Sequence, residues 1–392
     1  MKEYFMDLHL HIGRSNSGQA VKITASDKLT IENIIDEVKD KKGIDILGVV
    51  DAASPEVIKD IEVLLDQSKL IALEDGGLSY NQEITILLGS EMEVKSELGQ
   101  AHLLSYFPYL EDIKKFSSIM SNYISNINLS TQMTYLTAQE LFQIVDELGG
   151  IIIPAHSFTP HKGLYGSYSD SLRDSFSRDA FDKIAAIELG LSADSEMADH
   201  LSELAAKTFL SNSDAHSLGK IGREYNKVLV KEASFKEVLL ALRREGGRKV
   251  LGNYGLSPKL GKYHRSYCLE CKQKLIAKIP AIKCYNNPKH KIVKGVLDRL
   301  IEIADKEEAI HPKHRPAYYH QVPLLDIPGI GPKTLDQLID SFGSEMNILH
   351  KVSDEDLKEI VGRKIASTII KAREGQLTII PGGGGKYGKV SN

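Results

Sequence analysis

The 392-residue sequence contains no tryptophan, only three cysteines and no long apolar run. Its apolar stretches are strand-sized, like residues 151–154, and its first residues lack the apolar core of a secretory signal. The sequence therefore predicts a protein without a membrane segment. All three cysteines lie between positions 268 and 284. Three cysteines in one segment exclude a disulfide framework and indicate metal binding in a reducing cytoplasm.

Charge is divided unevenly along the chain. Residues 1–250 carry a net charge of −12, and residues 251–392 carry a net charge of +8. Between Lys259 and Lys294 there are ten basic residues and a single acidic residue, Glu270. Such a segment attracts polyanions, nucleic acid above all, although a solvated surface explains a charge run equally well. The length and the globular composition, with 42% hydrophobic and 26% charged residues, predict two or three domains.

Short apolar segments alternate with helical patterns over the first 250 residues, which predicts an α/β architecture with a largely parallel sheet. The expected strands are residues 46–50, 84–88, 151–154, 184–189 and 209–211, and the expected helices are residues 30–41, 55–67, 137–148 and 199–207. Six strands, the N-terminal one included, have an ionisable residue at or just past the carboxyl end. In a closed parallel barrel these ends meet on one face, where active sites form.

The residues at these strand ends are of the types that bind divalent metals. His9 and His11 lie two apart on a strand, so their rings share one face, and Asp214 and His216 are expected to repeat this geometry. The candidate ligands are His9, His11, Glu91, His102, His156, Asp214 and His216, with Asp51 as a further candidate. They suffice for two ions such as Zn²⁺, Mg²⁺ or Mn²⁺, and two ions stabilise the attacking and leaving oxygens of phosphoryl transfer. Catalytic roles are predicted for His9, His11, Glu91, His156, Asp214 and His216.

Other ionisable residues nearby have different expected roles. Asp7 and Glu188 are expected to orient the ligand histidines rather than bind metal. Glu93 is expected to face solvent. The histidines expected to be ordinary surface or core residues are His161, His200, His264 and His350.

An ordered set of these residues resembles the PHP (polymerase and histidinol phosphatase) metallophosphoesterases. The set is His9-x-His11, Glu91, His102-Leu-Leu, His156 and Asp214-Ala-His216. The resemblance implies a distorted (β/α)7 barrel over residues 1–254. Within that superfamily, the stretches 153–160, 188–192 and 210–224 are most similar to the endonuclease Q family.

Two positions depart from the wider superfamily pattern. Many members have Ser-Asp-Gly shortly after the His-x-His, whereas residues 15–18 here read Ser-Asn-Ser-Gly. Many also place a histidine directly after the aspartate that corresponds to Asp51, where this chain has Ala52. In the superfamily the two missing residues help to hold a third metal. A third ion here would depend on His216 and Asp51, so we expect two well-held metals.

The three cysteines predict a separate structural zinc site within residues 255–305. Cys268-x2-Cys271 is followed, after twelve residues, by Cys284-x5-His290, and Cys3His is a common closed tetrahedral set for zinc. His264 is the alternative fourth ligand. Because so small a module has little apolar core, one Zn²⁺ is expected to hold it together.

A third motif follows after residues 306–321, which are expected to form a linker. Over residues 322–376, the string Pro328-Gly-Ile-Gly-Pro-Lys333 resembles a helix-hairpin-helix DNA-binding motif. Gly329 and Gly331 permit a tight turn whose N–H groups, together with Lys333, are expected to contact DNA phosphates. A plain helical hairpin is the alternative. Residues 377–392 form a glycine-rich tail, expected to be mobile until a ligand binds.

The residues alone predict a metal-dependent phosphodiesterase that binds DNA. Resemblance to endonuclease Q further implies DNA repair: a nick 5′ of a deaminated base (uracil, hypoxanthine, xanthine) or an abasic site, with 3′-hydroxyl and 5′-phosphate products. The expected partner is DNA containing deaminated bases, and the expected location is cytoplasmic and nucleoid-associated. Recognition of one base is expected to require its extrusion into a pocket, for which Tyr165, Tyr168 and Asn212 are weak candidates.

Two alternative functions remain compatible with the barrel sequence. A small-molecule phosphoesterase of the histidinol-phosphatase kind needs neither a zinc module nor a DNA-binding hairpin, so the C-terminal half disfavours it. A non-catalytic DNA-binding protein with a degenerate barrel is the other alternative, and the missing third-metal residues are the argument for it.

Overall fold

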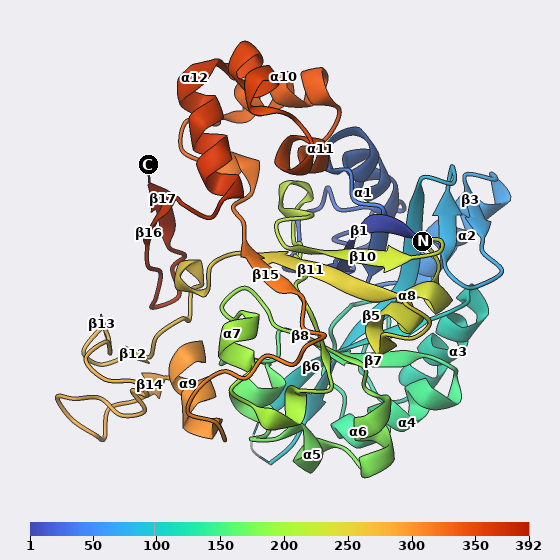
Figure 1. Cartoon of the computed structure of the whole chain (residues 1–392). Helices are drawn as coiled ribbons and strands as arrows, with labels where there is room; N and C mark the ends of the chain where they lie inside the picture. The colour runs from blue at the N-terminus through green and yellow to red at the C-terminus, as the bar shows by residue number, and fades with distance from the viewer. Residues whose placement is uncertain (98, 392) are drawn as a thin grey trace.

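A distorted barrel of strands surrounded by helices forms the N-terminal part of the protein. The computed structural model describes residues 1–97 and 99–391 (Figure 1). The strands around the barrel are β1 (Lys2–Leu10), β2 (Ile46–Val49), β5 (Ile84–Lys95), β6 (Gln100–Phe107), β7 (Ile151–Pro154), β8 (Ala186–Glu188) and β9 (Thr208–Leu210). Backbone hydrogen bonds from Ser157 N to Glu188 O and from His11 N to Ala215 O continue the ring after β7 and β9. The predicted α/β barrel is confirmed.

The sequence predicted a largely parallel sheet, but the barrel sheet is mixed. β1, β2 and β5 are parallel neighbours and β8 pairs in parallel with β9, but β6 runs antiparallel to both β5 and β7. β5 ends at Lys95 and β6 begins at Gln100, and so short a connection can only reverse the chain. β5 is also longer than predicted, so Glu91 and Glu93 lie within the strand.

Further strands extend the sheet at both edges. β10 (Tyr225–Val230) pairs antiparallel with β1, β11 (Lys249–Gly255) pairs with β10, and β15 (Ala317–His320) adds in parallel to β11. The hairpin of β3 (Leu70–Ala72) and β4 (Leu78–Tyr80) pairs with β5. The prediction of a linker over residues 306–321 is therefore wrong for β15, whose pairing partner lies far away in the sequence.

Helices cover the outside of the barrel. They are α1 (Ile31–Glu37), α2 (Pro55–Asp66), α3 (Leu110–Met120), α4 (Ala138–Glu147), α5 (Leu172–Ser175), α6 (Arg178–Lys183), α7 (Ser195–Ala198) and α8 (Phe235–Arg243). A capping box between Thr137 and Glu140 opens α4, and the Ser234 side chain caps α8. In place of the helix predicted at 199–207, the structure has the short α7 and a 3-10 turn at Ser202–Leu204.

Apolar burial holds the strands of the barrel together. One buried cluster takes side chains from β1, β2, β5, β6, β7, β8 and β9 and from α8, and Leu8, Leu87 and Leu210 are among its members. On β5 and β8, Glu91 and Glu188 lie an even number of residues after the cluster members Leu87 and Ala186. These polar side chains therefore share the face of the sheet with the apolar cluster and lie further toward the site described below.

A small module of short strands and one helix follows the barrel. Its elements are β12 (Tyr267–Cys268), β13 (Gln273–Lys274), β14 (Ile292–Val293) and α9 (Val296–Ile303). The buried Asp298 carboxylate of α9 pairs with Arg265 at 3.1 Å and also accepts the backbone N–H groups of Ser266 and Ala281. Apart from this network the module buries few apolar side chains, Leu275 and Ala281 among them.

A helical domain packs against the barrel, away from the small module (Figure 1). It contains α10 (Pro332–Phe342), α11 (Glu345–His350) and α12 (Asp354–Arg373), and Gly362 interrupts α12 with a φ of +75°. Lys42 Nζ lies 2.6 Å from Glu345 Oε1 in a buried ion pair that joins barrel and domain. Among the described residues, no helix combines the length and apolarity that a membrane span requires.

The glycine-rich tail is a hairpin rather than a free loop, contrary to the expectation from its composition. β16 (Thr378–Ile380) pairs antiparallel with β17 (Lys389–Ser391). Gly382 N and Gly388 N donate to the carbonyl oxygens of Lys259 and Leu260. In Figure 1 this dark red hairpin lies between the helical domain and the small module.

Candidate active site

His9 and His11 stand at the carboxyl end of β1 and are fully buried. Their ring centroids are 5.2 Å apart, as expected for side chains on one face of a strand. His9 Nδ1 lies 3.0 Å from Glu188 Oε2, and His11 Nδ1 lies 3.1 Å from Asp51 Oδ2. Both Nε2 atoms are buried without a hydrogen-bond partner among the described residues. Two buried imidazole nitrogens that face carboxylates in this way fit the ligand chemistry of a divalent metal.

A first group of donor atoms joins these histidines to Asp214. The candidate ligand atoms of His9, His11 and Asp214 all lie within 4.8 Å of one another. Asp214 Oδ1 is 3.4 Å from His11 Nε2 and 3.6 Å from His9 Nε2. This geometry could hold one ion.

A second group forms around Glu91. The donor atoms of Glu91, His102 and His156 also lie within 4.8 Å of one another. Glu91 Oε1 is 2.9 Å from His102 Nδ1 and 3.3 Å from His156 Nε2, and the same oxygen is 3.5 Å from His9 Nε2. Glu91 therefore stands between the two groups, which is the position of a carboxylate shared by two ions. Burial would raise the pKa of Glu91, but His102 and Lys22 hold this pKa well below its ordinary value.

Asp214 does not lie on a strand, contrary to the geometry predicted for the pair with His216. β9 ends at Leu210, and Asp214 follows in a loop with a left-handed φ of +47°. Arg223 Nε donates to Ser213 O at 2.7 Å, and Arg223 Nη2 donates to Asp214 O at 3.2 Å. Backbone contacts therefore hold the aspartate in a conformation that non-glycine residues rarely adopt.

Asp7 supports the same loop rather than a histidine ring. Its carboxylate accepts the backbone N–H groups of Ser213 and Gly222, each at 3.0 Å. It meets His9 only through a 3.3 Å contact from the His9 N–H. Burial raises the pKa of Asp7 to about 6. The prediction that Asp7 orients a ring is wrong for this side chain.

Asp51 and His216 lie beside the two donor groups but outside them. Asp51 contacts His11 Nδ1 and accepts the Ile12 N–H at 2.6 Å, so in this structure it orients a histidine and is not placed as a ligand. The His216 ring lies 4.7 Å from the His11 ring, and its Nδ1 lies 3.1 Å from Asp214 O. Burial lowers the pKa of His216, and the positive charges of His11 and Lys22 act in the same direction.

Glu188 has the position that the sequence predicted for an orienting residue. Besides His9 Nδ1, its carboxylate accepts the backbone N–H of His156 and the side-chain amide of Asn212, both at 3.0 Å. One buried carboxylate thus connects both donor groups to the segment after β9.

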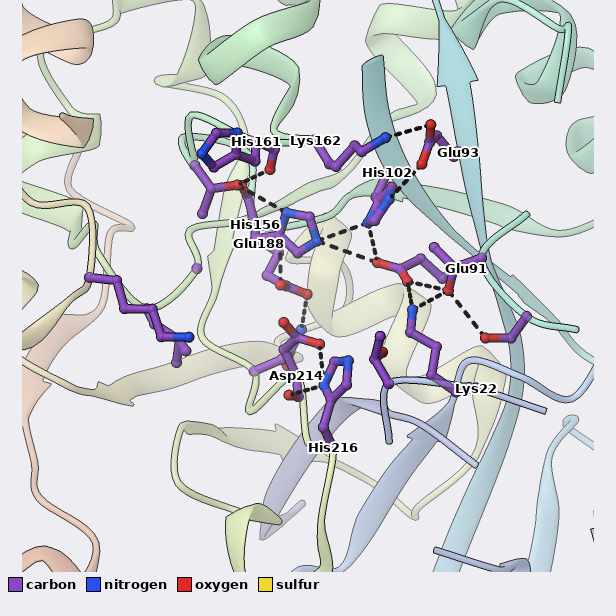
Figure 2. Close-up of a pocket in the computed structure, with 18 of the residues that line it drawn as sticks. Lys22, Glu91, Glu93, His102, His156, His161, Lys162, Glu188, Asp214 and His216 are labelled. Atoms are coloured by element: carbon purple, nitrogen blue, oxygen red, sulfur yellow. Dashed lines mark hydrogen bonds and ion pairs between the residues drawn. The ribbon is translucent and has the colours of Figure 1, made fainter. Parts of the chain in front are cut away.

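A cavity of about 490 Å³ opens over both groups. Its wall contains residues for which the sequence predicted no role. Lys22 contacts Glu91, and Lys162 Nζ lies 2.6 Å from Glu93 Oε1, so Glu93 is paired and buried rather than solvent-facing. Figure 2 shows Glu91 between His102 on one side and Lys22 on the other. Loop lysines have no sequence spacing that could have identified them.

Another part of the cavity wall comes from the C-terminal half of the chain. Lys262 and Tyr263 reach it from the segment before β12, and Tyr387 reaches it from the C-terminal hairpin. The Tyr263 ring meets His161 edge to face at 5.2 Å, so His161 also belongs to the wall, contrary to expectation.

The predicted base-pocket tyrosines do not reach the cavity. Tyr165 is fully buried, stacks on Phe158 and donates its hydroxyl to Glu203 Oε1 at 2.7 Å. Tyr168 is buried and accepts the Ala138 N–H at 3.0 Å. Both were wrong candidates, because their rings belong to the apolar core. Asn212 does line the cavity, although its amide is bonded to Glu188.

The four predicted zinc ligands converge in the small module. The donor atoms of Cys268, Cys271, Cys284 and His290 lie within 4.8 Å of one another. Cys271 Sγ is 3.2 Å from His290 Nδ1 and 3.7 Å from Cys284 Sγ. The backbone N–H of Asn287, and to a smaller extent that of Asn286, lowers the pKa of the Cys284 thiol to about 6. Three sulfur donors and one imidazole fit a tetrahedral zinc site, and His264 is not part of the group.

The helical domain has two glycine hairpins in succession. Gly329 has a φ of +92°, and Gly331 caps the N-terminus of α10 with Pro332 as its first residue. Gly362 makes the equivalent break between the two halves of α12. Lys333 is exposed beside the first turn.

Sequence families match both halves of the chain. The family described as "SAM-like Helix-hairpin-helix tandem" matches residues 322–374, and the family described as "PHP-associated" matches residues 194–245. The "Uncharacterized protein YqxK" of Bacillus subtilis (strain 168) is 47% identical over 393 residues, which is 100% of both chains. The "Uncharacterized protein MJ0043" of Methanocaldococcus jannaschii is 40% identical over 255 residues, 60% of this chain and 31% of that longer protein.

Two solved structures share the complete architecture. The crystal structure of the lesion-specific endonuclease PfuEndoQ from Pyrococcus furiosus has a TM-score of 0.84 and 34% identity, covering 99% of this chain and 95% of that chain. An endonuclease Q complex with a 27-mer duplex substrate, with an abasic lesion at the active site, has a TM-score of 0.83 and 34% identity, covering 99% and 96%. Since barrel, small module and helical domain all correspond at this identity, the chain belongs to the endonuclease Q family of the PHP superfamily.

Proposed function

We propose that this protein is a metal-dependent DNA repair endonuclease that cuts the strand 5′ of a deaminated base (uracil, hypoxanthine, xanthine) or an abasic site. The products would be a 3′-hydroxyl and a 5′-phosphate. The observation that carries the proposal is the correspondence over 99% of the chain with an endonuclease Q that was captured on an abasic duplex. The two adjacent donor groups beside one cavity support the same chemistry.

The buried residues prepare the site for this reaction. Glu188 and Asp51 face the Nδ1 atoms of His9 and His11, so the lone pairs of both Nε2 atoms are directed inward. Two divalent ions, when bound, would neutralise charge on the phosphate oxygens and make a water molecule more acidic. His9, His11 and Asp214 would hold one ion and Glu91, His102 and His156 the other. The ions could be Zn²⁺, Mg²⁺ or Mn²⁺.

The helical domain would hold the DNA backbone. Helix α10 begins with N–H groups that its own turn leaves free, and the helix dipole favours an anion there. Lys333 adds a positive charge next to this turn. Such contacts position a duplex without reading its sequence, so lesion choice is assigned to the cavity.

The test uses end-labelled duplexes that carry one uracil, one hypoxanthine, one abasic site or no lesion, incubated with Mg²⁺ or Mn²⁺. We expect a single nick 5′ of each lesion and none in the undamaged duplex. Direct sealing of the nick by DNA ligase, without synthesis, would identify the adjacent 3′-hydroxyl and 5′-phosphate ends. Cutting of undamaged DNA at an equal rate, or hydrolysis of only small phosphate monoesters, would contradict the proposal.

A further inference from the structure

Lys22 is the one described lysine that contacts a candidate metal-ligating carboxylate. It comes from the loop between β1 and α1, and its side chain is only 11% exposed. Its ammonium lies 3.0 Å from Glu91 Oε2 and hydrogen-bonds the Thr131 hydroxyl, which itself donates to the same carboxylate oxygen at 2.7 Å. A backbone hydrogen bond from Ser130 N to Val21 O fastens the two loops to each other.

The ammonium is held in place and has capacity for another partner. An ammonium has three N–H donors, and Glu91 and Thr131 accept two of them. Lys22 is also a wall residue of the cavity. One donor thus remains for an acceptor that enters the cavity.

The position of Lys22 relative to the two donor groups is defined by Glu91. Its Oε1 faces His102 and His156, whereas its Oε2 faces Lys22 and lies 3.6 Å from His11 Nε2 (Figure 2). The ammonium is therefore one carboxylate away from both groups. An acceptor that enters the cavity beside Glu91 would therefore approach both donor groups and this ammonium.

The charge of the site gives this ammonium a role. The carboxylates in direct contact with the buried histidines are Asp51, Glu91, Glu188 and Asp214. Two divalent ions would balance these four negative charges, and Lys162 already pairs with Glu93. A phosphodiester brings one further negative charge, and more develops on its oxygens in the transition state. Lys22 is the remaining cation at this point of the wall.

Its charge state supports the assignment. A lysine side chain is ordinarily protonated at neutral pH, and Lys22 has two hydrogen-bond acceptors against its nitrogen, the Glu91 carboxylate and the Thr131 hydroxyl. The side chain is therefore an ammonium at neutral pH.

We infer that Lys22 is a catalytic residue whose ammonium donates a hydrogen bond to a nonbridging oxygen of the scissile phosphate. This inference rests on the proposed endonuclease function. It assigns to the chain a fixed cation in addition to bound metal.

The first experiment measures single-turnover cleavage of a saturating abasic duplex. Lys22→Met should lower the rate by about 100-fold or more, as the loss of one transition-state donor does elsewhere. Lys22→Arg, which keeps the charge, should recover part of the loss. Lys28→Met, on the exposed part of the same loop, is the matched control. Mn²⁺ affinity and duplex affinity are measured on the same samples, and both should stay within about threefold of wild type.

Two outcomes of this experiment would overturn the inference. One is a wild-type rate for Lys22→Met. The other is a variant that binds Mn²⁺ weakly and regains the wild-type rate in excess Mn²⁺, because Lys22 would then only hold Glu91 in place. Failure of the wild-type protein to cut the duplex would instead contradict the proposed function.

A second experiment needs only the wild-type protein, so it does not depend on the folding of a variant. Each nonbridging oxygen of the scissile phosphate is replaced in turn by sulfur, and cleavage is compared in Mg²⁺ and in thiophilic Mn²⁺ or Cd²⁺. One diastereomer should be slowed in all of these ions, because its sulfur faces the ammonium rather than a metal. Full recovery of both diastereomers in thiophilic ions would assign both oxygens to metal and reject the role of Lys22.

Discussion

Acid should loosen the helical domain from the barrel through a single half-buried histidine, His350. His350 ends α11 and lies against the barrel, with its Nε2 2.7 Å from the Tyr225 hydroxyl. Its ring is 4.7 Å from the Phe5 ring and 4.9 Å from the Tyr254 ring. Burial, followed by the positive charges of Lys227 and Arg373, lowers the pKa of His350 to about 4. The neutral ring is therefore the form that fits this interface.

The folded and unfolded states bind the His350 proton at different pH values, and this difference sets the direction in which stability changes with pH. In the unfolded chain His350 binds a proton near its ordinary value of 6.5, whereas in the folded protein it does so only near pH 4. Between these values the unfolded state binds more protons, so the free energy of unfolding falls as the pH falls and is unaffected above 6.5. At about 1.4 kcal/mol for each pH unit, the loss between pH 7.5 and pH 5.0 amounts to about 2 kcal/mol. Partial solvent contact of the ring makes this an upper value.

The assay is urea unfolding followed by circular dichroism at pH 7.5 and pH 5.0. His350→Gln is the informative variant, since the amide can still hydrogen-bond the Tyr225 hydroxyl, which itself donates to Gln321, but does not titrate. The wild type should lose up to about 2 kcal/mol more than this variant when the pH is lowered. His161→Gln, which removes an exposed histidine, should behave like the wild type. Equal pH dependence in wild type and His350→Gln would refute the reasoning.

Three further predictions concern the metals and the DNA contacts. Asp214→Asn should keep the fold and duplex affinity but lower the nicking rate by at least about 100-fold, because even residues that merely orient metal ligands change activity by 10- to 100-fold; a wild-type rate would place the active site elsewhere. Cys271→Ser should lose one zinc per chain by elemental analysis and add a local unfolding transition, whereas His264→Ala should keep the zinc. Lys333→Ala should weaken binding to damaged and undamaged duplexes alike and lower the slope of log affinity against log salt by about 1. An unchanged slope would remove Lys333 from the DNA contacts.

The parts of the site that the sequence predicted are those with short-range spacing. His9 and His11 are two residues apart on a strand, and that alone places both rings on one face. Cys268 and Cys271 likewise specify a tight turn before any fold is known. Glu91 and Glu188 were predicted because each is a carboxylate at or just past the end of a predicted strand. Only aspartate and glutamate side chains offer a carboxylate that can bind a metal or orient a histidine.

The parts that the sequence did not predict depend on contacts between distant segments. Lys22 is a loop lysine without any spacing signal, and only the pairing of its loop with the one at Thr131 brings it to Glu91. Tyr165 looked like a residue of the cavity rim, but its ring completes the apolar core. β15 was missed because its pairing partner, β11, lies far away in the chain. The C-terminal hairpin was missed because a run of glycines separates its two strands.

The zinc module and the cavity are coupled through these long-range contacts. Lys262 and Tyr263 line the cavity directly before β12, and Lys274 of β13 contacts the carbonyl oxygens of the C-terminal hairpin that carries Tyr387. The Lys262 ammonium also lies 4.5 Å from the centre of the Tyr387 ring. Because the module buries so little apolar surface, the order of this wall should depend on the metal bound by its cysteines. Loss of that metal should therefore weaken lesion-dependent cutting while both donor groups of the barrel stay intact.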